Sequence, residues 1–156
     1  MDIVRKAKSI ATSALEGRID QVRQPRIDHA SRVAAYVKAH GGSILQIAAA
    51  WLHQVPECTS TTVDDLRQQG MPPEVTSIVE ALSHRDGEDT HSHAERIIGT
   101  PDAVLVKLGD LQDTARPEWL ALMDHATRSR LEEKQATMGR HLDSMNRTTP
   151  RPACWL

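Results

Sequence analysis

Three residues with metal-binding side chains occur on separate stretches that have helical periodicity. His29 and His53 lie beside apolar residues, and Asp110 lies three residues after Lys107. Imidazole nitrogen and carboxylate oxygen are the ligands that zinc, iron and manganese take in proteins. Because side chains from facing helices can meet at the centre of a bundle, these three residues could close one metal site. The plainer alternative is that the histidines are satisfied core residues and that Asp110 only pairs with Lys107.

The stretches that carry these residues have clear helix boundaries. Apolar residues recur three and four positions apart, which is the period of an amphipathic helix. Ser43 and the Thr-Pro-Asp sequence at 100–102 are typical of helix starts, and the glycine pair at 41–42 is typical of a helix end. The expected helices cover residues 2–16, 26–40, 43–55, 62–69, 73–82, a stretch that ends at 98, 101–115 and 117–146.

The overall composition indicates one all-α domain. The chain has 156 residues, of which 39% are hydrophobic and 26% are charged, a balance typical of a single globular domain. We find no alternating strand and no pair of strands joined by a hairpin turn. The prediction is therefore an all-α, irregular single-domain helical bundle over residues 1–146, followed by a flexible C-terminal tail over residues 147–156.

Charge and targeting signals exclude several classes of function. The formal net charge is -2 and the aromatic content is 3%, so we expect no nucleic-acid partner. No apolar run approaches the roughly 20 residues that a membrane helix needs, so we expect no membrane partner. Cys58 and Cys154 do not form a disulfide framework, and the first residues lack the apolar core of a signal peptide. A cytoplasmic location is expected.

Three segments occur in an order that resembles a known family. They are "DHASRVAAYV", then "IAAAWLHQVPECTSTTVDDL", then "AVLVKLGDLQDTA". Together they resemble the HD-domain metal-dependent phosphohydrolases, and most of all the branch related to guanosine polyphosphate (alarmone) 3′-pyrophosphohydrolases. The resemblance covers about residues 20–125 and implies an all-α fold of the HD-domain type.

The resemblance also implies a set of site residues and a divalent metal. Manganese is the first expectation, and zinc or iron are alternatives. The implied metal ligands are His29, His53 and Asp110, with Gln54 as a weak fourth, and Glu57 is implied to position or activate water. The residues implied to contact a phosphate or nucleotide substrate are Arg26, Arg85, Lys107, Thr114 and Arg116.

Several polar residues of the family pattern are replaced in this chain. Gln54 stands in place of the aspartate of the His-Asp doublet, Cys58 replaces the second acid of a Glu-Asp pair, and Thr114 replaces a later asparagine. A neutral amide brings no negative charge, so the metal is expected to be weakly bound or absent. Protons should compete with it as the pH falls through about 6.5. Cys58 could ligate as a thiolate or simply fill the space that an acid left.

A second group of histidines lies in the polar segment 83–93. His91 and His93 are two residues apart, and such residues do not face each other on a helix. With His84 they are therefore expected to belong to a solvated loop and not to a second metal site.

Different functions remain open at this point. The first is a metal-dependent phosphohydrolase acting on a nucleotide or another small phosphate compound, with reduced activity because one lost acid–base group commonly costs about 10²–10⁴ in rate. The second is a catalytically degenerate HD domain that binds a nucleotide or a protein partner without turnover. Different chemistry in the old pocket is a third alternative, and the long last helix could form a homodimer contact.

Overall fold

The computed structural model describes residues 2–146, and its regular secondary structure is entirely helical within that range. The helices are α1 (Ile3–Ala14), α2 (Arg26–Ala39), α3 (Ile44–Leu52), α4 (Val55–Cys58), α5 (Val63–Gln68), α6 (Pro73–Leu82), α7 (Thr90–Ile98), α8 (Pro101–Thr114), α9 (Pro117–Leu120) and α10 (His125–Asn146). The predicted all-α bundle is confirmed, whereas the predicted tail at 147–156 lies outside the described residues. None of the described helices combines the length and apolar character needed to cross a lipid bilayer.

The helix starts follow from local hydrogen bonding. The Asp2 carboxylate accepts a hydrogen bond from the Val4 amide at 2.9 Å at the start of α1. At α3, Ser43 and Gln46 form a capping box, in which each side chain accepts a hydrogen bond from the other residue's backbone amide. Such caps satisfy amides that have no partner within the helix, so α1 and α3 begin at defined residues.

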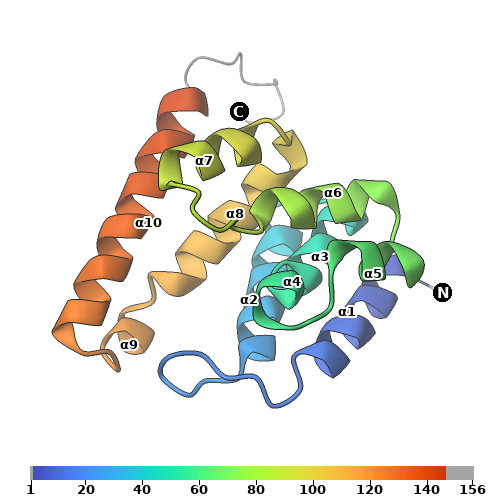
Figure 1. The fold of residues 1–156 in the computed structure, drawn as a ribbon, viewed down its shortest axis with the longest axis horizontal. Helices are drawn as coiled ribbons and strands as arrows, with labels where there is room; N and C mark the ends of the chain where they lie inside the picture. Colours follow the sequence, from blue (N-terminus) through green and yellow to red (C-terminus); the bar gives the residue numbers. More distant parts are fainter. Residues whose placement is uncertain (1, 147–156) are drawn as a thin grey trace.

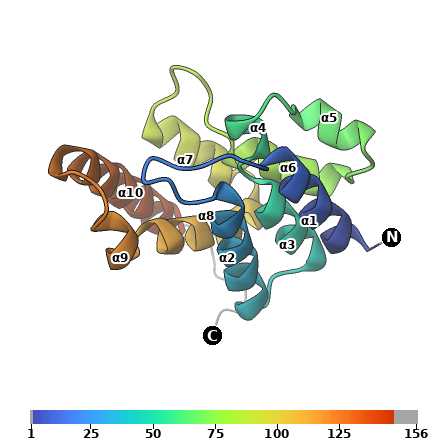
Figure 2. The ribbon, with the colours of Figure 1, turned by 90° about the horizontal axis from the view of Figure 1, so that it is seen from below.

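Helix α3 lies at the centre of the bundle and contacts α1, α2, α6 and α8 (Figures 1 and 2). Its three consecutive alanines at 48–50 are fully buried, and Leu52 is fully buried beside them. Small side chains on several faces of one helix let neighbouring helices approach it from different directions. The C-terminal end of α3 is therefore held on several sides, and this end carries His53.

Helices α2 and α8 pack closely at Gly109. A Cβ atom at this position would lie 2.9 Å from Cδ1 of Tyr36 and 3.3 Å from Cγ1 of Val33. Because glycine has no side chain, the ring of Tyr36 can pack directly on the α8 backbone. This contact holds together the two helices that carry His29 and Asp110.

Three boundaries differ from the sequence-based expectations. Pro56 does not simply end α3 but lies in the first turn of α4, where its missing amide costs no helical hydrogen bond. The expected helix from Pro117 is divided into α9 and α10, because Asp124 caps a new start and accepts from the Thr127 amide at 2.9 Å. His91 and His93 lie within α7 and not in the preceding loop.

Candidate metal centre

The side chains of His29, His53 and Asp110 converge from α2, the end of α3 and α8. Nε2 of His29 lies 3.0 Å from Oδ1 of Asp110 and 3.3 Å from Nε2 of His53. Nε2 of His53 lies 3.8 Å from the same Asp110 oxygen. The structure therefore brings together three of the four residues expected to be metal ligands.

The His53 ring is oriented by the backbone of its own helix. Its Nδ1 lies 2.6 Å from the carbonyl oxygen of Ala50. A carbonyl can only accept, so Nδ1 carries the proton, and in the neutral ring Nε2 presents its lone pair to the other two ligands. This arrangement fixes the tautomer that a metal ligand requires.

His29 lies between two carboxylates. Its Nδ1 donates to Oδ2 of Asp113 at 2.6 Å, and its Nε2 lies 3.0 Å from Asp110. Burial disfavours the charged ring, but the hydrogen bonds to Asp110 and Asp113 outweigh burial and raise the pKa of His29 from 6.5 to about 9. A metal ion that bound this ring would therefore compete with a proton at pH values well above the expected 6.5.

Asp110 is ionised in this setting. Burial opposes its charge, but the Lys107 ammonium and the hydrogen bond from His29 outweigh burial and hold the pKa of this carboxyl well below its usual range. Nζ of Lys107 lies 2.7 Å from Oδ2 of Asp110, which leaves Oδ1 facing the histidines. The pairing with Lys107 expected as the plainer alternative is present, and it does not displace Asp110 from the cluster.

The spacing and chemistry of these donors fit a divalent ion. Ligand atoms on one tetrahedral ion with bonds of about 2.0–2.2 Å lie roughly 3.3–3.6 Å apart. The three observed separations of 3.0, 3.3 and 3.8 Å surround this range. Two neutral imidazoles and one carboxylate are also a ligand set that binds zinc or iron in other proteins.

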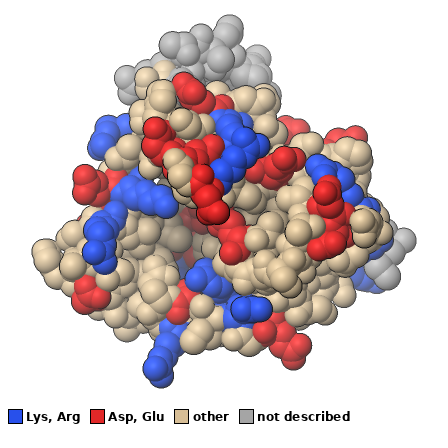
Figure 3. Space-filling model, in the orientation of Figure 1, with Lys and Arg blue, Asp and Glu red and all other residues tan. Residues whose placement is uncertain are grey.

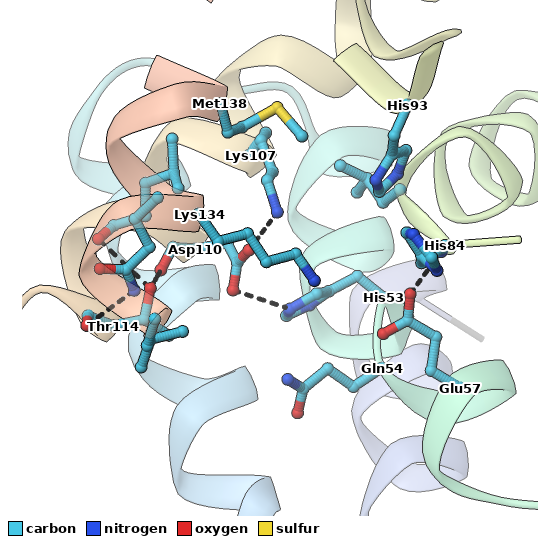
Figure 4. A pocket seen from close by; sticks show the side chains of 14 residues that line it. His53, Gln54, Glu57, His84, His93, Lys107, Asp110, Thr114, Lys134 and Met138 are labelled. Atoms are coloured by element: carbon cyan, nitrogen blue, oxygen red, sulfur yellow. Dashed lines mark hydrogen bonds and ion pairs between the residues drawn. The ribbon is translucent and has the colours of Figure 1, made fainter. Parts of the chain in front are cut away.

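A cavity of about 190 Å³ opens beside the cluster and is bordered by Gln54 and Glu57 (Figure 4). Oε1 of Gln54 is buried and has no hydrogen-bond partner among the residues that the structure describes. Oε1 of Glu57 accepts from the backbone amide of His84 at 2.5 Å, while its other oxygen points towards the cavity in Figure 4. Gln54 and Glu57 thus bring an amide group and a held carboxylate to the lining of the cavity that His53 and Asp110 also border.

Cys58 does not border this cavity. Its side chain is half-buried and packs against the hydrophobic core. Burial raises the pKa of the Cys58 thiol, so the thiolate form that could bind a metal is disfavoured. The structure favours the interpretation that this residue fills apolar space.

The residues expected to contact substrate are divided between the cavity and other surfaces. Lys107 and Thr114 border the cavity, whereas Arg26, Arg85 and Arg116 do not. Nε of Arg26 donates to the Ile19 carbonyl at 3.2 Å. Arg85 lies in the segment before α7, where its backbone amide donates to Glu88. These two arginines are therefore separate from the metal cluster in this structure.

Asp113 is a site residue that the sequence analysis did not identify. Besides His29, it accepts from Nε of Arg32 at 2.6 Å and from Nη2 of Arg32 at 3.2 Å. Nε of Arg116 lies 3.1 Å from its Oδ1. Burial opposes the Asp113 charge, but the hydrogen bonds from His29 and Arg32 outweigh burial and lower its pKa. Arg116 therefore supports the carboxylate that orients a candidate ligand.

His84 and His93 border the cavity on the side opposite α8 (Figure 4). Their ring centroids are 5.5 Å apart, and Nε2 of His93 lies 3.1 Å from the Ala81 carbonyl. Burial lowers the pKa of His93, and the positive charges of Lys107 and Arg96 lower it further. The expectation of a fully solvated loop is wrong for His93, because this residue is buried in α7.

A comparison with known protein families agrees with this geometry. The profile of the HD domain matches residues 7–97, which is more than half of the chain. The chain belongs to the HD domain family. HD domains bind divalent metals and are commonly metal-dependent phosphohydrolases. A comparison with curated proteins finds no significant match. His29 and His53 lie within the matched segment, whereas Asp110 and the whole of α10 follow it.

Proposed function

We propose that this HD domain is a metal-dependent phosphohydrolase that acts on a nucleotide or another small phosphate compound. The observation that carries the proposal is the convergence of His29, His53 and Asp110 beside an open cavity. A divalent ion held there would make a water molecule more acidic and stabilise negative charge on a phosphoryl oxygen. We expect manganese first, with zinc or iron as alternatives.

The residues around the cavity have roles that follow from their contacts. Asp113 would hold His29 by its Nδ1 proton and so keep Nε2 directed to the ligand position. Glu57, fixed at one oxygen by the His84 amide, would accept a proton from the attacking water through its other oxygen. Gln54 would add a neutral carbonyl as a weak fourth ligand after a rotation of its side chain.

A second candidate function is binding without turnover, and one observation favours it. Gln54 supplies no charge at the cluster, and Cys58 is packed against the core and supplies no second acid. Removing one positioned acid–base group commonly costs about 10²–10⁴ in rate. A slow enzyme or a degenerate domain that binds a nucleotide or a partner protein would both follow from these replacements.

Phosphate release from a panel of substrates tests the proposal. The panel contains guanosine polyphosphate, other nucleotides and small phosphate esters, each with added manganese. His53→Ala should abolish release, whereas His125→Ala, which removes an exposed histidine at the start of α10, should leave it unchanged. Metal bound by the wild type without release from any member of the panel would refute the hydrolase and support the binding function.

A further inference from the structure

We propose that Lys134 of α10 binds the substrate and selects for a dianionic phosphate group. This inference rests on the proposed function of the metal centre and adds Lys134 as a substrate-binding residue of the same cavity. Lys134 lies on a helix that follows the segment matched by the family profile, so the family alone does not assign it a role.

The position of Lys134 is fixed by its neighbours on α10. Leu131, Lys134, Gln135 and Met138 occur at helical spacing and all border the cavity. Met138 is buried, and Nε2 of Gln135 donates to the carbonyl oxygen of Thr114 at 2.9 Å, which attaches α10 to the end of α8. The backbone that carries Lys134 is therefore held against the rim of the cavity.

The side chain of Lys134 extends across the cavity towards His53 and Asp110 (Figure 4). Among the described residues, Lys134 forms no ion pair, whereas the other lysine of the cavity, Lys107, is paired with Asp110 at 2.7 Å. In Figure 3 the surface is hollowed between α10 and the rest of the molecule, and basic and acidic side chains alternate along the α10 side. Lys134 is thus the cation of this cavity that remains available to an incoming anion.

The charges around the cavity specify the charge of the ligand. Its charged lining residues are Glu57, Lys107, Asp110 and Lys134, and their formal charges cancel. With neutral histidines and a divalent ion, the loaded cavity has a formal charge of about +2, which would be about +1 without Lys134. A phosphate monoester carries about -1.5 to -2 at pH 7, so Lys134 matches the cavity to a terminal phosphate.

The size of the cavity limits what else it can hold. Its volume of about 190 Å³ is below the roughly 300–1,000 Å³ of sites that enclose a whole drug-sized ligand. Within residues 2–146, no Trp, Tyr or Phe side chain borders it, so this part of the chain offers no large aromatic surface on which a base could stack. The geometry therefore favours a ligand that inserts its phosphate and leaves the rest of the molecule at the mouth.

Binding of inorganic phosphate tests this assignment without measuring turnover. Affinity is measured by calorimetric titration of the manganese-loaded protein, with matched variants on the same helix. Lys134→Gln should weaken phosphate binding about tenfold. This loss lies between that expected for removing an exposed ion pair and that expected for removing a desolvated hydrogen bond to a charged group. Lys134→Arg should retain most of the affinity. Arg130→Gln, which removes an exposed charge of α10 away from the cavity, should bind as the wild type does.

The outcomes separate this inference from the proposed function. A Lys134→Gln protein that binds phosphate like the wild type, or an equal loss in Arg130→Gln, would overturn the role of Lys134. No phosphate binding by the wild type would overturn it as well. A loss specific to Lys134→Gln supports the inference even if no substrate is hydrolysed, in which case only the hydrolase proposal fails. Hydrolysis with an unchanged KM in Lys134→Gln would support the hydrolase and refute the role of Lys134.

Discussion

Metal binding should release one proton from His29 at neutral pH. In the structure the ring donates to Asp113 through Nδ1 and to Asp110 through Nε2, which raises its pKa to about 9. At pH 7.5 such a group is roughly 97% protonated. Because a metal ligand needs its lone pair, the Nε2 proton must leave when the ion binds.

The size of the effect follows from the same pKa. Competition with this proton should lower the apparent affinity at pH 7.5 about 30-fold relative to its value well above pH 9. Calorimetric titrations with manganese or zinc in two buffers of different ionisation enthalpy measure the number of protons released. The expected contribution of His29 at pH 7.5 is close to one proton per ion, and the apparent affinity should rise about tenfold per pH unit up to pH 9.

Asp113→Asn provides the internal control. Without this carboxylate the pKa of His29 should fall, so fewer protons are released at pH 7.5. The affinity above pH 9 should also drop about 10–100-fold, because the ring loses the partner that orients it. Tight binding by the wild type with no proton release, together with loss of binding in His29→Ala, would refute this account of the charge on His29.

Four further predictions concern the stability and the metal affinity of the domain. The pKa of His29 is about 9 in the folded protein and 6.5 in the unfolded chain, so protonation of His29 stabilises the protein without metal by about 3 kcal/mol. This stabilisation is fully present below pH 6.5 and is lost as the pH rises through 9. Denaturant unfolding at pH 6 and pH 9.5 should show the difference, and His29→Ala should abolish it. Gln54→Asp should tighten manganese binding, measured by calorimetry. Cys58→Asp should lower the free energy of unfolding by about 1–3 kcal/mol, because it places a carboxyl at a half-buried position packed against the core. Equal stability of Cys58→Asp and the wild type would contradict the second of these predictions. Gly109→Ala should destabilise by about 1–3 kcal/mol and weaken metal binding, because its Cβ would approach Tyr36 to 2.9 Å. Thermal melts measure the stability of this variant and of the matched change Gly139→Ala in α10, whose Cβ would meet no described atom within 4 Å. Gly139→Ala should be neutral or stabilising, and similar losses in both variants would refute the packing argument.

The helices and the convergence of the three candidate ligands were predictable because their signals are local or depend on order along the chain. Periodic apolar residues and the caps at Asp2 and Ser43 define helices without knowledge of their neighbours. The family pattern then supplied the order of His29, His53 and Asp110, and the structure places them in one cluster.

The support around His29 was harder to predict because it depends on how two helices are rotated against each other. Asp110 and Asp113 are three residues apart on α8, and His29 and Arg32 are three residues apart on α2. Residues at this spacing share a helix face, so the pairs form a ladder of opposite charges when the helices pack together. This spacing is visible in the sequence, but many exposed helices carry similar pairs.

The burial of His93 could not be derived from composition. The surrounding segment is polar, and the preceding residues 83–89 indeed form no helix. The N-cap at Asp89, which accepts from the Ser92 amide at 2.7 Å, starts α7 earlier than the apolar periodicity indicates. Packing of α7 against α6 and α8 then buries one histidine of the pair and leaves the other exposed.

The distribution of the ligands along the chain has a consequence during protein synthesis. His29 and His53 leave the ribosome together with α1 to α3, but Asp110 follows only after α8 has been made. At typical elongation rates this interval lasts on the order of several seconds. The nascent chain therefore presents two histidines without their carboxylate, a pair with little power to retain a hard cation such as manganese. If the three side chains bind manganese as we propose, the ion can be acquired only after translation has passed α8, and a ribosome-bound chain halted before Asp110 should carry no manganese.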